Sequence, residues 1–373
     1  MDSPLSGCVV LDFSRLLPGP LGCRFLAEMG AEVIKIEEIK NPDPARLYPP
    51  IQEGVSFLYM ALNAGKRFIE YDSNNPQDKK ALTDLILRAD ILVEQYKPGT
   101  MSKMGLGFEE VSKINPQIIY VSVNGYSADS PQYKKAGHDL NYMAECGALN
   151  LLRDGQGHPI VPLFQMADVA GGTYGLVMSV LSALLYRHKT GHGCYIQVPM
   201  TEFTRQILFL PMIWSQLHDN LDNFMLNGSL PNYCIYRCKD GFVALGALEP
   251  KFWMTFCQAI EKSEWATRLF SDNDGGRSLK NEVSEYLQKL TVEEVVKKCS
   301  STECCVTPMH NSISDYWNNK MFSENSFQIG ELNEKPIRIP IFPLNTLTTT
   351  LNKNTVKIGR DNIYYGFSQN SEK

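Results

Sequence analysis

The sequence lacks an excess of basic residues: 36 lysines and arginines stand against 41 aspartates and glutamates, which gives a net charge of −5. This balance excludes the broad positive surface that binds nucleic acid and a polybasic membrane anchor. A local basic site for a phosphorylated small molecule stays open. Apolar residues make up 43% and charged residues 21% of the 373 residues, which excludes wholesale disorder and suffices for two ordinary domains.

Targeting and disulfide patterns are also missing. The N-terminus shows neither a charged stretch followed by an apolar one nor an Arg-rich transit segment. The ending, Asn370 to Lys373, is not a peroxisomal tripeptide. The ten cysteines are too scattered for a disulfide scaffold, and the pair Cys234 and Cys238 has no second pair at zinc spacing. We therefore predict a cytoplasmic protein with reduced thiols and no metal site.

Only one apolar run approaches the length of a membrane span. Residues 169–186 carry no charge and reach the lower limit for crossing a bilayer. Three glycines, two serines and a threonine dilute this run, and no second span exists. The run therefore predicts a buried core helix, and we expect no membrane partner.

The motifs of the common cofactor-dependent enzymes are absent as well. The turn after the first predicted strand reads SRLLPGP over residues 14–20, not the G-x-G-x-x-G of dinucleotide-binding proteins. Gly65 and Lys66 are followed by Arg67 instead of Ser or Thr, so they do not form a P-loop. Neither H-E-x-x-H nor G-x-S-x-G occurs. We therefore predict an activity without a bound cofactor.

What is present is an alternation of strand-like and helix-like segments. Apolar or alternating runs predict strands at residues 8–13, 33–37, 68–72, 91–94 and 118–123. Helical segments between them predict an α/β fold with a mostly parallel sheet. Later, strand-like runs at 233–237 and 242–246 predict a hairpin, and the helical segments after it predict a smaller α+β domain. The predicted divisions are a large domain at 1–200, a linker helix at 201–224, a small domain at 225–325 and a C-terminal segment at 326–373.

Two short segments carry the candidate chemistry. In each of the segments 136–142 (AGHDLNY) and 165–172 (QMADVAGG), ionisable residues stand where an apolar helix begins. The structural interpretation is helix capping, because an Asp at a helix start accepts backbone N–H bonds. The functional interpretation is that His138 and Asp168 move protons while free N–H groups hold a developing oxyanion. The pattern alone leaves both interpretations open.

A family resemblance decides between them. The chain resembles family III CoA-transferases and racemases over about two thirds of its length, in collinear order. The segments that carry this resemblance include LSGCVVLDFSRLLPGP (5–20), GAEVIKIE (30–37), LNAGKR (62–67), YKPG (96–99), MGLG (104–107), YRCKDG (236–241) and GALEPKF (246–252).

The resemblance also implies a reaction. In the transferases, the aspartate that matches Asp168 is a nucleophile that forms an acyl intermediate. The racemases keep this aspartate, add a histidine in the Gly-His-Asp segment and carry a Gly-x-x-Glu-Pro segment. This chain has His138, Asp168 and Glu249 together, which favours a racemase or epimerase of 2-methylacyl-CoA thioesters. The alternatives are a CoA-transferase that uses Asp168 as nucleophile and a non-catalytic acyl-CoA-binding protein.

Inverting a carbon beside a thioester carbonyl requires two acid–base groups on opposite faces of that carbon. His138 and Asp168 are the predicted pair, and burial beside apolar neighbours is expected to raise the pKa of Asp168. The resemblance implies that Glu249 orients the histidine. We expect backbone N–H groups just after Asp168 to contact the enolate, and Gly171 and Gly172 to let the ligand approach the backbone closely.

The substrate thioester brings a nucleotide and a pantetheine arm. The predicted CoA-binding residues, with the basic ones expected in loops that follow strands, are Arg15, Lys66, Arg67, Lys97, Lys103, Gly137, Asp139 and Tyr142. Glu38 departs from the racemase pattern, which often has an arginine there. The resemblance further implies that the C-terminal segment returns to the large domain, and that the protein is an intertwined homodimer with each active site between the large domain of one subunit and the small domain of the other.

Overall fold

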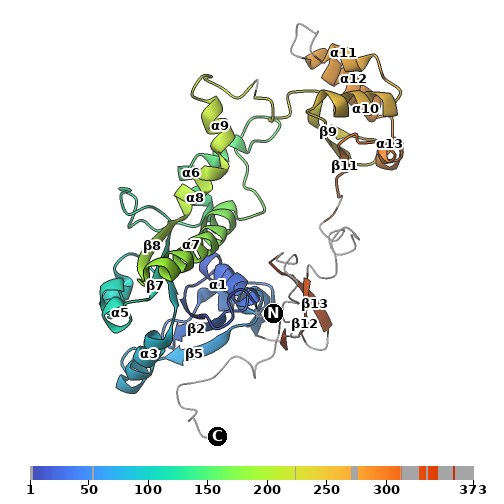
Figure 1. Ribbon diagram of the computed structural model, residues 1–373. Helices are drawn as coiled ribbons and strands as arrows, with labels where there is room; N and C mark the ends of the chain where they lie inside the picture. The colour runs from blue at the N-terminus through green and yellow to red at the C-terminus, as the bar shows by residue number, and fades with distance from the viewer. Residues whose placement is uncertain are drawn as a thin grey trace. The chain divides into compact units, whose positions relative to one another are not determined.

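The computed structural model divides the chain into two compact units (Figure 1). Unit 1 comprises residues 1–208 and 322–373, and unit 2 comprises residues 209–321. The residues that the structure describes are 3–52, 54–222, 224–269, 276–310, 312, 327–332, 335–342 and 356–357. The divisions predicted from the sequence fall at residues 200, 224 and 325.

Unit 1 is built on a six-stranded sheet in the order β5-β2-β1-β6-β7-β8. Every pairing in this sheet is parallel, which confirms the predicted α/β class. The strands are β1 (Val9–Phe13), β2 (Glu32–Glu38), β5 (Arg67–Tyr71), β6 (Ile91–Glu94), β7 (Ile119–Asn124) and β8 (Cys194–Pro199). The sequence pattern did not predict β8, which lies at the sheet edge and is only partly buried.

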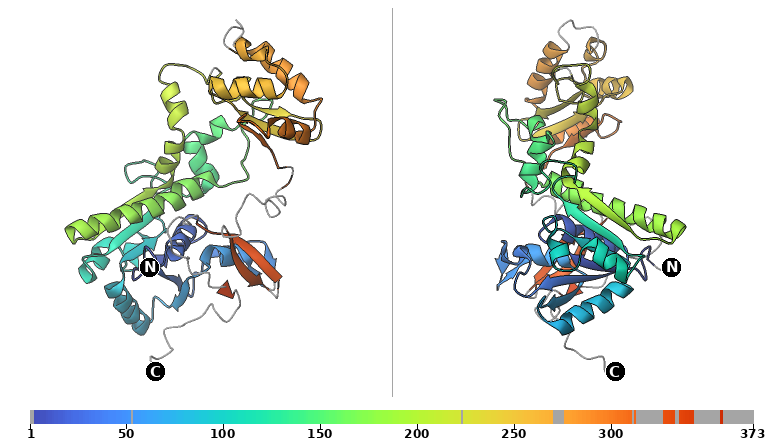
Figure 2. Two further views of the ribbon diagram at one scale, coloured as in Figure 1. Left: turned by 45° about the vertical axis from the view of Figure 1, so that its right-hand side comes forward. Right: turned by 90° about the vertical axis from the view of Figure 1, so that its left-hand side faces the viewer.

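Helices cover both faces of this sheet, because successive strand residues point to opposite faces. Val10 packs in one apolar cluster, and its neighbour Leu11 packs in another. The first cluster includes residues of α1 (Pro18–Glu28) and α7 (Gly175–Thr190). The second includes residues of α3 (Pro76–Arg88) and α5 (Phe108–Ile114). Figure 2 shows the same layering from two further directions.

Shorter elements complete unit 1. Between β2 and β5 lie η1 (Pro44–Leu47), β3 (Ile51–Gln52), β4 (Val55–Ser56) and α2 (Phe57–Asn63). The remaining helical segments are α4 (Thr100–Lys103), α6 (Asp139–Glu145), η2 (Ala148–Leu151), η3 (Ala167–Tyr174) and α8 (Met200–Ile207).

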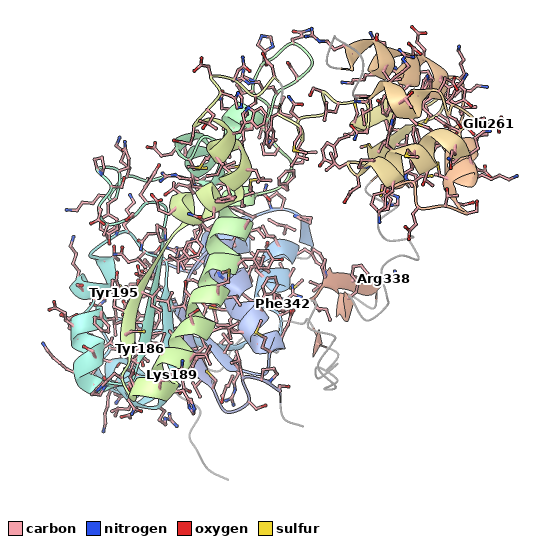
Figure 3. The ribbon with its side chains drawn as sticks, turned by 45° about the horizontal axis from the view of Figure 1, so that its top comes forward. Tyr186, Lys189, Tyr195, Glu261, Arg338 and Phe342 are labelled. Atoms are coloured by element: carbon pink, nitrogen blue, oxygen red, sulfur yellow. The ribbon has the colours of Figure 1, made fainter. Side chains whose placement is uncertain are left out.

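Part of the C-terminal segment packs on α1. The described strands of this segment are β12 (Phe327–Leu332), β13 (Lys335–Pro340) and β14 (Val356–Lys357). The Arg24 guanidinium donates to the Pro340 carbonyl at 2.7 Å. The Phe342 ring, labelled in Figure 3, lies 5.0 Å from the ring of Phe25 between centroids. These contacts join the C-terminal segment to the large sheet's first helix.

One helix in the described part of the chain, Ala167–Thr190, is long and apolar enough to cross a membrane by length and composition alone. Its residues Leu176, Val177 and Val180 are buried in the core of unit 1. Its other side is apolar and exposed: Leu185 is 65% exposed. Tyr186, labelled in Figure 3, is 50% exposed. The helix therefore presents one apolar side to the core of unit 1 and another to its surface.

Unit 2 has its own core. An antiparallel sheet in the order β11-β10-β9 carries the predicted hairpin. Trp253, Phe256 and Leu279 are buried in the core behind it. The elements are α9 (Phe209–Trp214), β9 (Tyr233–Arg237), β10 (Phe242–Gly246), α10 (Pro250–Ala259), α11 (Trp265–Arg268), α12 (Arg277–Leu287), α13 (Val292–Cys299) and β11 (Val306–Pro308). This arrangement confirms the predicted α+β character of the smaller part.

The strand order of the large sheet locates its ligand crevice. From β1 the chain builds outward through β2 to β5, and it then returns to the other side of β1 to add β6, β7 and β8. The order therefore reverses between β1 and β6. Parallel sheets bind their ligands at such a switch point, beyond the carboxyl ends of the strands. The turns that follow β1 and β6 are thus the natural walls of a binding site.

Candidate active site

The first candidate segment leads into α6. His138 precedes the helix in an extended conformation, with its side chain at the surface, and its backbone N–H donates to the Asn141 side chain at 3.1 Å. Asp139 is the first residue of the helix. The N–H groups at a helix start have no partner within the helix. His138 thus stands at a helix start with an exposed imidazole.

The second segment meets the first directly. Asp168 is the second residue of η3, a π-helical turn, and its backbone N–H donates to the Asp139 carboxylate at 2.9 Å. This bond joins two segments 29 residues apart. Such π-helical turns often occur at functional sites, where they displace a side chain from the regular helical spacing. The structure therefore brings Asp168 beside the residue that follows His138.

The carboxyl groups of Asp168 and Asp139 both have raised pKa values. Burial, with the neighbouring charge of Asp139, raises the pKa of Asp168 to about 7. Burial also raises the pKa of Asp139, although the N–H groups of Asp168 and Ala167 oppose this rise by donating to its carboxylate. A carboxyl group with a pKa near neutrality both gives and takes a proton readily under working conditions. Asp168 is therefore suited to proton transfer.

Tyr142 fixes the turn before His138. Its side chain is buried, and its hydroxyl donates to the Gly137 carbonyl at 2.6 Å. A β-carbon on Gly137 would lie 2.8 Å from the Tyr142 ring, and one on Gly125 would lie 2.3 Å from it. Both glycines therefore let the ring close against the backbone. In this structure Tyr142 holds the backbone of the residue before His138.

The glycines after Asp168 serve helix packing. A β-carbon on Gly171 would lie 2.6 Å from the Met200 carbonyl oxygen, and one on Gly172 would lie 2.6 Å from the side chain of Pro18. The expectation that they open the backbone to a ligand is therefore wrong, because α8 and α1 occupy that space. The expected free N–H groups just after Asp168 are also wrong at the first position, since the Val169 N–H donates to the Gln165 carbonyl at 2.9 Å.

Two of the predicted CoA-binding residues lie in the turns that follow β1 and β6. Arg15 follows β1, and its guanidinium donates to the Asn41 side chain and the Pro42 carbonyl. It also lies over the Tyr96 ring, 5.8 Å from the centroid. Lys97 follows β6 and is exposed. Both cations are therefore placed at the carboxyl ends of neighbouring strands.

The helix start in this crevice offers no amide cradle for phosphate. α1 begins with Pro18, Gly19 and Pro20, and the two prolines have no N–H. The Gly19 N–H donates to the Gln95 side chain at 3.0 Å. Helix starts bind phosphate through free N–H groups. Side chains must therefore supply the positive charge here.

Lys66 and Arg67 do not lie in a loop that follows a strand, so that expectation is wrong for both. Lys66 precedes β5 and is buried, and its ammonium pairs with Asp12 at 2.8 Å. The same nitrogen donates to the Pro20 carbonyl and the Asn63 side chain, each at 2.8 Å. Arg67 opens β5 and pairs with Glu32, the first residue of β2.

Both residues thus have structural partners. Burial alone would raise the pKa of Asp12, but Lys66 and then Lys35 lower it to about 2, so this carboxylate stays charged inside the protein. Arg67 reaches back toward the amino end of β2, opposite to the edge that carries Arg15 and Lys97. Neither position favours direct contact with CoA.

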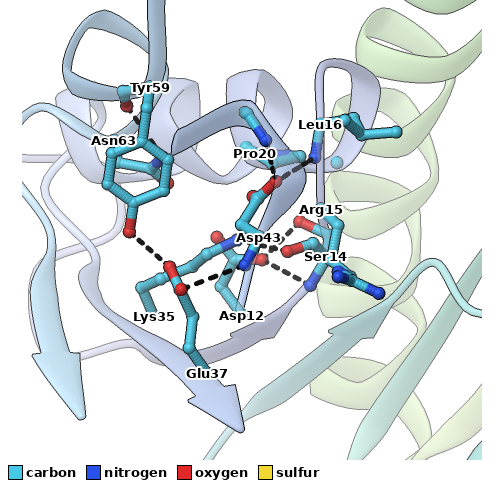
Figure 4. Close-up of polar contacts among 12 residues, drawn as sticks. Asp12, Ser14, Arg15, Leu16, Pro20, Lys35, Glu37, Asp43, Tyr59 and Asn63 are labelled. Carbon is cyan, nitrogen blue, oxygen red and sulfur yellow. Dashed lines mark hydrogen bonds and ion pairs between the residues drawn. The ribbon is translucent and has the colours of Figure 1, made fainter. Parts of the chain in front are cut away.

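A buried charged network surrounds the turn after β1 (Figure 4). Lys35 donates to the Ser14 carbonyl and pairs with Asp43 at 3.3 Å. Asp43 accepts the Leu16 N–H at 3.0 Å, and Leu16 has a φ of 63°, which is uncommon for a residue with a β-carbon. Glu37 accepts the Tyr59 hydroxyl. The network therefore fixes the turn that carries Arg15.

This network was not predicted from the sequence. The sequence contains a sign of the network, because Asp12 interrupts the apolar run of β1, and Lys35 and Glu37 interrupt that of β2. Charged residues inside buried strands require partners, since an unpaired buried charge is costly. The partner Asp43 lies outside both strands and could not be identified from the pattern.

Two further predicted residues lie elsewhere. Lys103 ends α4 and is exposed. Glu249 belongs to unit 2, where it precedes α10 with an exposed side chain, and its carbonyl accepts the N–H groups of Phe252 and Trp253. Their roles toward CoA and His138 stay predictions. Within the described residues, no group of three or more His, Cys, Asp or Glu side chains is arranged to hold a metal ion.

Comparison with known families identifies the chain. The model of CoA-transferase family III matches residues 5–361. The chain belongs to this family. Human alpha-methylacyl-CoA racemase is 30% identical over 312 residues, which cover 82% of this chain and 77% of that protein. Members of both reaction classes are therefore related to the chain, since human succinyl-CoA:glutarate CoA-transferase is 31% identical over 275 residues.

The match to the transferase covers 70% of this chain and 60% of the human protein, so this chain spans less than two thirds of that relative. Among solved structures, Rv3272 from Mycobacterium tuberculosis superposes with a TM-score of 0.80 at 25% identity, over 94% of each chain. The family and fold are therefore established, and the chain is an enzyme of the family III CoA-transferase and racemase superfamily.

Removing the buried cation tests the structural assignment of Lys66. We expect Lys66→Met to lower the free energy of unfolding by about 3–5 kcal/mol, because Asp12 is left charged and unpaired. We expect Arg67→Ala to lower it by less than about 1 kcal/mol, since that pair is exposed. Urea denaturation measures both variants. A small effect of Lys66→Met would contradict the assignment.

The raised pKa of Asp168 predicts a pH-dependent stability difference. Its folded-state pKa lies above the unfolded value, so ionisation destabilises the fold as the pH rises from about 4 through 7. We therefore expect Asp168→Asn to stabilise the protein at pH 8 by on the order of 2 kcal/mol and to have little effect near pH 4. Thermal unfolding of this variant and of Asp129→Asn, an exposed control, measures the effect. An equal effect of Asp168→Asn at both pH values would refute the shift.

Proposed function

We propose that the protein is a racemase or epimerase of 2-methylacyl-CoA thioesters, with His138 and Asp168 as its acid–base pair. The observation that carries this proposal is the hydrogen bond from the Asp168 N–H to Asp139, which joins the two helix starts beside an exposed imidazole. The racemase relative and the His138, Asp168 and Glu249 set support it further.

The proposed reaction removes one proton from the α-carbon of the substrate and returns another proton to the same carbon. One member of the pair removes the α-hydrogen as a proton, and the C–H electrons form an enolate with the thioester carbonyl. The other member then gives a proton to the opposite face of the same carbon. Because the enzyme only exchanges protons, the reaction needs no cofactor besides the CoA of the substrate. Glu249 would orient the imidazole by accepting its second N–H.

The enolate oxygen requires donors, and the start of α6 supplies them. The N–H groups of Asp139 and Leu140 carry no hydrogen bond within the described chain. They follow His138 directly, so a thioester held beside the imidazole would place its oxygen near them. Preorganised donors of this kind stabilise developing negative charge. We assign the oxyanion contact to these two groups instead of the N–H groups after Asp168.

A CoA-transferase is the second candidate, favoured by the human transferase among the relatives. In that reaction, the Asp168 carboxylate attacks an acyl-CoA carbonyl and releases the CoA thiolate. The attacking carboxylate must be ionised. A pKa of about 7 leaves much of Asp168 protonated near neutral pH, which suits an acid–base residue better than a nucleophile. This observation favours the racemase.

Deuterium exchange tests the proposal. A single epimer of a 2-methylacyl-CoA incubated with the enzyme in D2O should gain one deuterium at the α-carbon while the epimer ratio moves toward one. Mass spectrometry and chiral chromatography measure the two changes. His138→Ala should reduce both rates by at least 100-fold, because general acid–base groups contribute about 10²–10⁴-fold.

The same variant separates the two candidates. A transferase would move CoA to a free carboxylate, would form an acyl-enzyme that hydroxylamine traps, and would keep most of its activity in His138→Ala. The racemase hypothesis fails if the wild-type enzyme incorporates no deuterium and leaves the epimer ratio unchanged. His192→Ala, at an exposed position between α7 and β8, serves as a matched control and should keep wild-type activity.

We also propose that the protein works as a homodimer in the cytoplasm. All ten cysteines are free, which is typical of a reducing compartment. Apolar side chains lie exposed along α7, and between α7, β8 and α8 they line a groove of about 510 Å³ that includes Met178, Tyr186 and Phe203. Contiguous exposed apolar surface of this kind is typical of protein interfaces.

Sedimentation equilibrium tests the dimer. The wild-type protein should sediment at twice the chain mass, and Leu185→Glu on α7 should shift it toward the monomer, because a charge would be buried in the interface. Leu87→Glu is the matched control, since Leu87 is an exposed leucine on α3, and it should leave the mass unchanged. A wild-type monomer at micromolar concentration would contradict the dimer.

A further inference from the structure

Glu38 stands at the carboxyl end of the second strand of the large sheet. It is the last residue of β2, and its register partner on β5 is Tyr71, the last residue of that strand. β2 is the neighbour of β1, whose following turn carries Arg15. Glu38 therefore lies on the same edge of the sheet as the crevice between β1 and β6.

One oxygen of the Glu38 carboxylate is held by a hydrogen bond, and the other is available to a ligand. The Ser73 hydroxyl donates to Glu38 Oε1 at 2.7 Å, and the other oxygen carries no hydrogen bond within the described chain. Because the hydroxyl holds only one oxygen, the second can accept a donor from a ligand. An acidic side chain at the end of the second strand binds ribose hydroxyls in parallel nucleotide-binding sheets. The position and the free oxygen of Glu38 match that function.

A second observation points to a polar ligand beside Glu38. The Tyr71 hydroxyl is buried and has no hydrogen-bond partner. Burial raises the pKa of this phenol, and the neighbouring Tyr96 and Glu38 raise it further, which places all three groups close together. Buried polar groups without a partner are rare and call for an explanation. A ligand hydroxyl that reaches this place would satisfy the phenol.

The charges around Glu38 disfavour a phosphate. The nearby cations of the β2 side are already engaged: Lys35 with Asp43, Arg46 with Glu37, and Lys40 with Asp72. Arg15 is the cation that lies over the Tyr96 ring, 5.8 Å from its centroid. Burial raises the pKa of this phenol, Arg15 lowers it and Glu38 raises it, so both charges act on Tyr96.

We propose that Glu38 selects the nucleotide of the thioester: its carboxylate accepts hydrogen bonds from an unphosphorylated ribose and repels a phosphate at that place, so that dephospho-CoA binds more tightly than CoA. The diphosphate then lies toward Arg15 and Lys97. This inference rests on the proposed function, because it takes the nucleotide of the thioester to lie along the carboxyl edge of the sheet.

Calorimetric titration of the full-length protein tests the selection. We expect the Kd of dephospho-CoA to be about tenfold below that of CoA, which corresponds to about 1.4 kcal/mol. Glu38→Gln should bring the ratio of the two constants near one, and Glu38→Arg should reverse it. The probes 5′-AMP and 3′,5′-ADP should show the same order, because they differ only in the ribose phosphate.

The control is Glu32→Gln, which removes one negative charge at the opposite end of the same strand and should keep the wild-type ratio. Circular dichroism checks that each variant is folded. If both ligands bind but the ratio is the same in wild type and both Glu38 variants, the selection is overturned and the CoA-dependent function stands. If the wild-type protein binds neither ligand, the selection and the proposed function both fail.

Discussion

One hydrogen bond organises the candidate active site: the bond from the Asp168 backbone to the Asp139 carboxylate. It fixes the start of η3 against the start of α6, so that two residues distant in sequence share one surface. Burial is the main cause that raises the pKa of Asp168 to about 7, and the neighbouring charge of Asp139 adds to it. The hydrogen bond thus sets the position of Asp168, and its protonation comes mainly from burial.

The sheet and most of its helices were predictable, and the reason is local. Strands such as β1 and β6 are nearly continuous apolar runs, which is how strands buried on both faces appear in a sequence. β8 was missed because an edge strand is half exposed and its run, YIQV, is short.

The site was predictable only in part, because its contacts are long-range. The ionisable residues at the two helix starts were visible in the sequence, but the bond between Asp139 and Asp168 was not. A lysine after a glycine suggests a phosphate ligand, yet Lys66 pairs with Asp12, 54 residues away, inside the protein. A glycine pair suggests an open backbone, yet Gly171 and Gly172 touch α8 and α1. In each case the residue type indicated a role, but the sequence did not reveal which residue it contacts.

The two prolines at the start of α1 have a consequence for how this fold can diverge. A site that cradles a nucleotide with main-chain amides is tied to its backbone, so changing its preference requires rebuilding a loop. Here Pro18 and Pro20 remove those amides, so recognition in the proposed nucleotide site falls to side chains at strand ends. A single codon change at such a position can alter ligand choice without disturbing the scaffold. The nucleotide end of the proposed site is therefore free to evolve separately from its proposed proton-transfer end.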